Sequence, residues 1–394
     1  MQFNYMCSDC GRNYTIDPKL TVCPVCGEQQ APDQPLRGVL DVELSGNAEK
    51  DFDVFDLLPV PRHFFPPIPV GNTPLWQPEN LRRSLGFENL YIKDDGLNPT
   101  GSLKDRASFL VSAFAAQHGI NEIVLASSGN AGSSMAGVAA AAGQQVTLFL
   151  PATAPAAKLV QALQYGATVH RVNGPYDDAY DLSLEYTNRF GGMNRSTAYN
   201  PMTLEGKKTV SLEIFQQLGG VPDYLFVASG DGCILSGVYK GFQDLRQLGL
   251  IDKFPTVIAV QAAGSDALYR AFQTGQFEAR PTRTVADSIC VNVPRNGWQA
   301  LKRLQTHNGR VITVSDEEII AAQARLSRTT GLFSEPAGAA AFAGFLKLSA
   351  ELAPAAGIVI LATGNGLKDS TAAVRGIAVP AETIKSLSDI TKGT

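Results

Sequence analysis

The sequence predicts an α/β fold in which parallel strands are covered by helices on both faces. Short apolar runs alternate with longer segments suited to helices through most of the 394 residues, and this alternation is typical of such sheets. Hydrophobic residues make up 44% and charged residues 18% of the chain, which excludes collagen-like, disordered and coiled-coil proteins. A chain of this length has enough residues for roughly two to three domains with cores of their own.

Each predicted strand is a short run rich in apolar and β-branched residues. These runs cover residues 122–126, 145–150, 168–172, 224–228, 256–261 and 357–362. Helical segments are predicted around the first three strands, at residues 105–117, 131–142 and 156–165. A further helix begins at Ser315, because the sequence S-D-E-E places Glu318 at the capping-box position.

Four of the six cysteines lie near the start of the chain, as two C-x2-C pairs formed by Cys7 with Cys10 and by Cys23 with Cys26. Four thiolates at this spacing favour one closed, tetrahedral zinc site with a structural role. Two disulfides are an alternative, which is disfavoured without an export signal. A redox C-x2-C motif is another, but such motifs lie at a helix start within a βαβ unit. We therefore predict a small zinc ribbon over residues 1–35.

Residues 36–69 follow this ribbon and mix proline, aspartate and aromatic residues without a clear period, which is typical of an extended linker. The formal net charge is −4, so a nucleic-acid partner held by a broad basic face is not expected. No apolar run approaches the ~18 residues of a membrane span, and no secretory signal is visible at the start. We expect a cytoplasmic protein that binds neither nucleic acid nor membrane.

Three predicted turns between a strand and a helix are polar and rich in glycine, at residues 98–106, 127–132 and 229–237. In parallel sheets, ligands bind where loop amides and helix N-termini converge at the strand ends. Each turn taken alone could be ordinary turn chemistry. The third loosely matches a dinucleotide fingerprint, but its last glycine is displaced and no acidic partner is evident. A Ser-His-Asp hydrolase is disfavoured because no G-x-S-x-G motif is present.

Taken in order and at this spacing, the turns and their neighbours resemble the pyridoxal-phosphate (PLP) enzymes of fold type II, and among these the threonine synthase family. The motifs are GNTPL at 71–75, the three turns, NP at 200–201, LEGKKT at 204–209, EPA at 335–337 and TGNGLKD at 363–369. The resemblance implies a tryptophan synthase β-like fold with two parallel-sheet α/β domains over residues 70–380. A smaller subdomain, about 106–200, would be inserted in the larger one, and 381–394 would form a tail. It also implies a homodimer acting on a small amino-acid substrate.

The resemblance implies that Lys104 carries PLP as a Schiff base. A partly desolvated ammonium near a helix N-terminus loses its proton readily, as this linkage requires. The phosphate of PLP would meet the backbone around Gly230, Asp231, Gly232, Cys233 and Ile234. We expect the Asp231 carboxylate to point away from the phosphate and to cap the following helix.

The same resemblance assigns roles to other residues. Asn130 would meet the 3′-oxygen of the pyridine ring, and Thr363 would meet the ring nitrogen with a neutral hydroxyl, which suits eliminations better than transamination. The residues expected to bind the substrate carboxylate are Ser127, Ser128, Gly129 and Ala131.

The sequence departs from the family where threonine synthases hold the phosphate of their substrate. Ala198 and Thr203 replace a serine and an arginine, and the loss of a bidentate arginine from a phosphate site is a large change. Lys207, Lys208 and Arg295 are the candidate replacements.

Three functions remain open. The first is a threonine synthase-like lyase that converts O-phosphohomoserine and water to threonine and phosphate. The second is a paralogue that performs β-elimination or β-replacement on a serine- or threonine-type amino acid, like a dehydratase, diaminopropionate lyase or cysteate synthase. The third is a catalytically silent binding protein on the same fold.

Overall fold

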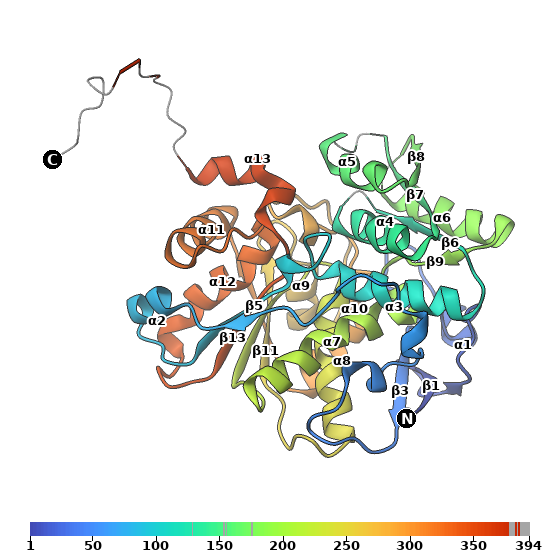
Figure 1. Ribbon diagram of the computed structural model, residues 1–394, viewed down its shortest axis with the longest axis horizontal. Coiled ribbons are helices and arrows are strands. Elements are labelled where there is room, and N and C mark those ends of the chain that lie inside the picture. Colours follow the sequence, from blue (N-terminus) through green and yellow to red (C-terminus); the bar gives the residue numbers. More distant parts are fainter. Residues whose placement is uncertain are drawn as a thin grey trace.

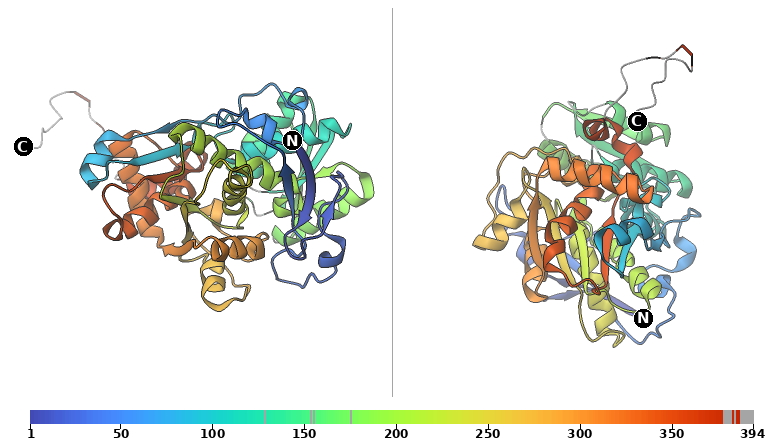
Figure 2. Two further views of the ribbon diagram at one scale, coloured as in Figure 1. Left: turned by 90° about the horizontal axis from the view of Figure 1, so that it is seen from below. Right: turned by 90° about the vertical axis from the view of Figure 1, so that its left-hand side faces the viewer.

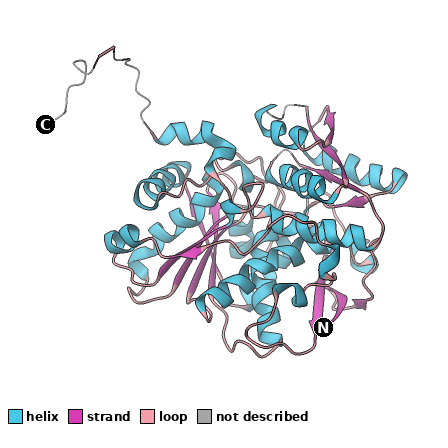
Figure 3. Ribbon diagram, in the orientation of Figure 1, coloured by secondary structure: helices cyan, strands magenta, loops and turns pink. Residues whose placement is uncertain are grey.

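The computed structural model describes residues 1–377, 383, 385 and 386, except for residues 128, 153, 155 and 175 and the side chains of 156–158. Helices surround three separate sheets (Figure 1, Figure 3). Most of the predicted tail at 381–394 lies outside the described residues. Within the described part of the chain, no helix has both the length and the apolarity needed to cross a membrane.

The larger sheet has six strands in the order β12-β11-β10-β13-β5-β4, and all neighbours are parallel except the edge pair β4–β5. Its strands are β4 (Leu75–Trp76), β5 (Leu90–Asp94), β10 (Tyr224–Ala228), β11 (Thr256–Ala262), β12 (Arg310–Val314) and β13 (Ile358–Ala362). Alternate residues of β10 enter two different cores, with Leu225 and Val227 on one face and Phe226 and Ala228 on the other. This alternation explains why the strand is apolar throughout.

Helices cover both faces of this sheet, and the predicted α/β class is confirmed. They are α2 (Glu79–Leu85), α7 (Pro201–Leu218), α8 (Cys233–Gln247), α9 (Ala267–Thr274), α10 (Gly297–Thr306), α11 (Asp316–Thr330), α12 (Pro336–Leu348) and the short α13 (Ser370–Ala373). The capping box predicted at the start of α11 is present, because the Ser315 side chain accepts from the Glu318 amide and the Glu318 side chain accepts from the Ser315 amide.

The smaller sheet is fully parallel, with the order β8-β7-β6-β9. Its strands are β6 (Glu122–Ala126), β7 (Gln145–Pro151), β8 (Thr168–Val172) and β9 (Met193–Asn194), and its helices are α4 (Asn130–Ala142), α5 (Ala156–Gln164) and α6 (Tyr176–Phe190). These elements lie between β5 and β10 in the sequence, so the chain leaves the larger sheet to build the smaller one and then returns. In Figure 1 they form the green group at the upper right.

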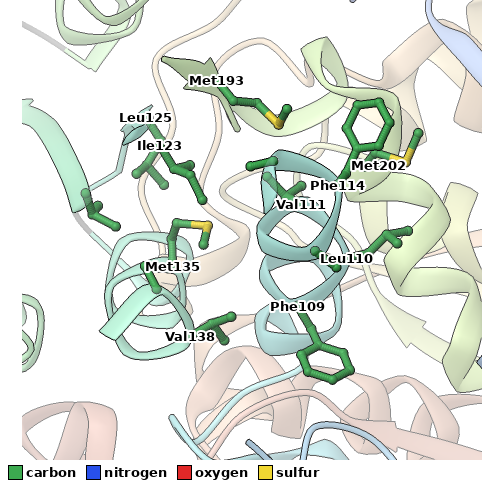
Figure 4. Packing of buried hydrophobic residues seen from close by; sticks show 14 of the residues in the cluster. Phe109, Leu110, Val111, Phe114, Ile123, Leu125, Met135, Val138, Met193 and Met202 are labelled. Atoms are coloured by element: carbon green, nitrogen blue, oxygen red, sulfur yellow. The ribbon is translucent and has the colours of Figure 1, made fainter. Parts of the chain in front are cut away.

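Helix α3 (Lys104–Gln117) lies between the two groups and packs against α4 on one side and α7 on the other. Figure 4 shows Val111 of α3 near Met135 of α4 and Ile123 of β6, while Phe114 and Leu110 face Met202 of α7. Each fully buried side chain of this size contributes about 1.5–3 kcal/mol. The helix that begins at Lys104 is therefore held by apolar packing from both sides.

The third sheet, at the N-terminus, has three strands that were not predicted individually, and one of them lies in the segment expected to be a linker. Strand β1 (Gln2–Cys7) pairs with β2 (Asn13–Tyr14) and with β3 (Leu40–Ser45), and the short helix α1 (Pro24–Gly27) lies between β2 and β3 in the sequence. The extended linker expected over 36–69 is therefore wrong at 40–45. The polar residue Asp41 obscures the strand pattern, because its carboxylate is buried in an ion pair with Arg303 of α10 at 2.7 Å. Figure 2 shows this dark-blue sheet at the end of the molecule away from α11 and α13.

A buried network of charges fixes the turn before Lys104. The Arg106 guanidinium donates from Nε and Nη2 to Asp95 at 2.6 and 2.8 Å, and from Nη1 and Nη2 to Glu213 of α7 at 2.6 and 2.8 Å. Glu213 also accepts from Lys93 Nζ at 2.6 Å and from the Asn72 amide at 2.8 Å. The network thereby joins β5, α3, α7 and the GNTPL segment. Although burial opposes ionisation, Arg106 and Lys93 lower the pKa of Glu213 to about 2.

We expect Arg106→Met to destabilise the protein by about 3–5 kcal/mol, because Asp95 and Glu213 would remain buried without their cation. The free energy of unfolding from denaturant titration at pH 7 measures this. Arg325→Met, which removes an exposed cation, should change it by less than ~0.5 kcal/mol. Equal stabilities of the two variants would contradict the structural importance of the network.

Candidate active site

The glycine-rich turns predicted from the sequence converge on one cavity of about 380 Å³, which is within the size range of small-molecule sites. Its lining includes Lys104, residues 126, 127 and 129–131 after β6, and residues 229–232 after β10. A wider opening of about 570 Å³ shares Gly129, Asn130 and Ser288 with it and extends to Lys368. The cavity therefore lies where strand ends of both sheets meet.

Lys104 is the first residue of α3 and lines the cavity. The preceding residue is fixed by a hydrogen bond from the Leu103 amide to the Thr363 carbonyl oxygen at 2.9 Å, which joins the start of α3 to the end of β13. Removal from water lowers the pKa of Lys104, while the carboxylates of Asp231 and Glu335 partly oppose this shift. A lysine whose amine is more readily neutral is suited to form a Schiff base.

Asn130 lies at the start of α4 and is held by a carboxylate to which the sequence analysis gave no role. Its Nδ2 atom donates to both carboxylate oxygens of Glu335 at 2.9 Å, so Glu335 fixes the orientation of the amide. Burial raises the pKa of Glu335, and the hydrogen bonds from Asn130 oppose this. The EPA motif drew attention to this position, but only the fold brings it to Asn130 across 205 residues of sequence.

The turn after β10 has the backbone of an anion-binding loop at the start of α8. Gly232 has φ +87°, and a Cβ atom at Gly230 would lie 2.7 Å from the Ile289 Cα atom, so both positions require glycine. The predicted capping by Asp231 is present, because its Oδ1 atom accepts from the Cys233 amide at 2.9 Å. That amide is therefore engaged within the loop, which differs from our expectation that it would face the cofactor.

The remaining predicted residues fall into two groups. Ser127, Gly129, Ala131 and Ile234 line the cavity, and Ser127 Oγ accepts from the Gly129 and Gly132 amides at 3.2 and 3.0 Å. Cys233 and Thr363 are buried and are not part of its lining. Ser128 lies outside the described residues.

The four N-terminal cysteines form a separate cluster. The sulfur atoms of Cys7, Cys10, Cys23 and Cys26 all lie within 4.8 Å of one another, and no disulfide joins them. Four thiols at this separation match the donor set of one tetrahedral metal ion. Cys23 also lies 3.1 Å from the Tyr14 hydroxyl.

The cavity fits PLP in three respects. Its lysine has a lowered pKa, its glycine turn begins a helix whose N-terminus favours a phosphate, and its volume suits a small cofactor. Such a lysine site between two parallel-sheet domains defines the PLP-dependent enzymes of fold type II. The family model described as "Pyridoxal-phosphate dependent enzyme" matches residues 68–364, and the chain belongs to this family.

The most similar curated relatives include several threonine synthases. The chain is 33% identical to that of Methanocaldococcus jannaschii, with 95% of each chain covered, and 34% identical to that of Methanosarcina acetivorans, with 93% and 92% covered. It is 36% identical to that of Mycobacterium tuberculosis, with 77% and 84% covered. The predictions of a PLP cofactor and of a threonine synthase-like lyase are thereby confirmed.

Solved structures of related enzymes have the same fold. Threonine deaminase isoform 2 from Solanum lycopersicum aligns with a TM-score of 0.69 at 21% identity, covering 85% of this chain and 96% of the other. Maize serine racemase aligns with a TM-score of 0.67 at 22% identity, covering 76% and 90%. At these identities the likeness establishes the fold.

Proposed function

We propose that the protein converts O-phosphohomoserine and water to threonine and phosphate, with PLP bound through Lys104. The observation that carries this proposal is the position of Lys104, with its lowered pKa, at the meeting point of three family motifs. Threonine synthases that align over nine-tenths or more of this chain support the choice of reaction.

The residues of the cavity and the bound cofactor would have the following roles in this reaction. Bound PLP supplies an electron sink for charge that develops on the α-carbon of the substrate. Lys104 is the base for the α-proton, because its lowered pKa makes the neutral amine accessible. Asn130, oriented by Glu335, would hold the ring oxygen, and Thr363 would meet the ring nitrogen. The amides at the start of α4 would bind the substrate carboxylate.

Two residues favour a second candidate function. Ala198 packs in an apolar cluster with Val39, Leu204 and Cys233, and the Thr203 hydroxyl donates to the carbonyl oxygens of Asn200, at 2.8 Å, and Thr197. Neither residue lines the cavity, so the usual serine–arginine grip on a substrate phosphate is missing. This supports a paralogue that performs β-elimination or β-replacement on a serine- or threonine-type amino acid.

Release of inorganic phosphate distinguishes the two functions. We expect the purified, PLP-loaded enzyme to release phosphate from O-phosphohomoserine and to form an equal amount of threonine. O-Phosphoserine, measured in parallel, should give little release because its side chain is one carbon shorter. Absence of release from O-phosphohomoserine, with a normal PLP spectrum, would favour the paralogue and direct the search to other amino acids.

We also propose that the four-cysteine cluster holds one structural Zn²⁺, and that the enzyme is a cytoplasmic homodimer with an amino-acid substrate and no nucleic-acid or membrane partner. The separation of the four sulfur atoms supports the metal. We assign the catalytic region to about residues 70–380, with a smaller subdomain at about 106–200. The smaller sheet falls within that insertion.

A further inference from the structure

Two buried cations next to Lys104 have no carboxylate partner among the described residues. Arg195, which follows β9, is 2% exposed and lines the cavity. Its Nη2 atom donates one long hydrogen bond to Ser108 Oγ at 3.3 Å, while its buried Nε atom has no partner. Lys207 of α7 is 3% exposed, and no hydrogen bond or ion pair joins its ammonium to a described residue. Burial of both cations is costly, and no ion pair with a described residue offsets this cost.

The neighbouring cations behave differently. Lys208, the next residue, donates to the Leu57 carbonyl oxygen and to Asp244, both at 2.7 Å, and is also paired with Glu205. Arg295 is paired with Asp177. Of the three cations expected to replace the missing arginine, Lys207 is therefore the one without an ion pair among the described residues. It is not part of the cavity lining, but it lies close enough to Lys104 and Arg195 for their charges to lower its pKa.

The charges of this group influence one another. Burial lowers the pKa of Arg195 to about 10, an effect that Cys233 opposes most strongly. Burial, together with the smaller effects of the charges of Arg195 and Lys104, lowers the pKa of Lys207 to about 8. Asp231 acts against these shifts, but its carboxylate already accepts from the Cys233 amide. Within the described part of the chain, no ion pair joins Asp231 to either cation.

A strained residue lies beside these cations. Thr197 has φ +35°, which is rare for a β-branched residue, and it lines the cavity. Its buried Oγ1 atom has no hydrogen-bond partner among the residues that the structure describes, and the same is true of Ser229 Oγ in the same lining. Strained backbone and unsatisfied donors are characteristic of ligand sites, because the bound ligand supplies the missing contacts.

We propose that Arg195, Lys207 and Thr197 form a binding site for a phosphate monoester dianion beside Lys104. This site would replace the phosphate-binding serine and arginine whose positions are occupied here by Ala198 and Thr203. Two cations match the charge of a phosphate dianion, and charge-assisted hydrogen bonds to phosphate are strong. The dianion is the phosphate of the cofactor or that of the substrate. This inference rests on the proposed function in that it places PLP in the same cavity.

The test uses Arg195→Gln, Lys207→Met and the double variant of the full-length protein. If the site holds the cofactor, the double variant binds PLP at least about tenfold more weakly while its affinity for pyridoxal, which lacks the phosphate, is unchanged. If it holds the substrate, PLP affinity is unchanged, KM for O-phosphohomoserine rises at least about tenfold, and the holoenzyme no longer binds inorganic phosphate. Either result supports the proposal. Unchanged affinities for PLP, O-phosphohomoserine and phosphate, or equal losses for PLP and pyridoxal, would overturn it.

Three controls separate charge from structure. Lys207→Arg should keep the affinity, and Arg325→Gln, which removes an exposed charge, should not affect it. Removal of a buried cation without an ion-pair partner should leave the Tm, measured without phosphate, unchanged or raise it. A clear decrease in the Tm would mean that the cations stabilise the core, and would overturn the proposal.

Failure of the proposed function can be distinguished from failure of this proposal. If the wild-type enzyme does not turn over O-phosphohomoserine, the proposed function fails, whereas phosphate binding that the double variant loses still supports this site.

The pH dependence gives a further readout. The titratable groups around Lys207 are Arg195 after β9, Lys104 on α3, Asp231 in the turn before α8 and the Cys233 thiol at the start of α8. Burial raises the pKa of the Cys233 thiol, so it is neutral in this pH range. Lys207 loses its proton as the pH rises through about 8, where a phosphate ester is already a dianion. The affinity of the wild-type protein for the dianion should therefore fall above pH 8. A fall of the same size in Lys207→Met would count against the role of this lysine.

Discussion

Replacement of Lys104 by alanine is expected to abolish turnover and to remove the absorption band of lysine-bound PLP. In the proposed function this side chain is both the covalent attachment of the cofactor and the base for the α-proton, so its removal would eliminate both roles at once. The measurements are the visible absorption spectrum after addition of PLP and the rate of phosphate release from O-phosphohomoserine.

Two comparisons make the Lys104 experiment specific. Lys302→Ala, at an exposed lysine of α10, should keep both the spectrum and the rate. Lys104→Arg keeps a positive charge but cannot form the linkage, so it should be as inactive as the alanine variant. A normal spectrum in Lys104→Ala would assign the attachment to a different lysine.

Loss of the cysteine cluster is expected to have the second largest effect. If the proposed zinc site is correct, serine at both Cys7 and Cys10 should abolish zinc binding and lower the Tm, because structural zinc in small domains contributes on the order of 10 kcal/mol to folding. Protein that remains folded should keep its rate per molecule, since the cluster and the cavity share no residues. Metal analysis, thermal unfolding and the phosphate-release assay measure the three quantities.

The matched control is Cys290→Ser, which removes a thiol that lies outside the cluster. It should leave the zinc content unchanged. If the double serine variant were fully folded, free of zinc and inactive, the metal would have a role in catalysis and the structural assignment would be wrong.

The fold could be predicted where local sequence determines local structure. Strands 122–126 and 224–228 were predicted with the bounds that the structure has, because each is a continuous apolar run buried on both faces. The start of α11 was predicted because its capping box involves residues three positions apart. The position of Lys104 at the start of α3 followed from the same kind of local pattern together with the family motifs.

Features that depend on distant partners could not be predicted. Strand β3 contains Asp41, whose burial depends on Arg303, 262 residues further along the chain. Lys207 and Lys208 are neighbours in the sequence, yet Lys208 faces Asp244 while Lys207 has no such partner among the described residues. The packing of α7 against α8 determines which of the two adjacent lysines is paired with a carboxylate. No local sequence pattern predicts this difference.

The order of strands in the larger sheet also determines when the active site can form during synthesis. Strand β13 lies between β10 and β5, although it is the last strand in the sequence among the described residues. Until residue 362 has left the ribosome, β5 and β10 lack their shared neighbour, and the carbonyl oxygen of Thr363 that fixes Leu103 is absent. All strands of the N-terminal sheet and of the smaller sheet are synthesised before β13. The nascent chain therefore contains these two sheets complete, while the larger sheet still has exposed edges. The cavity around Lys104 can therefore be completed only after β13 has been synthesised.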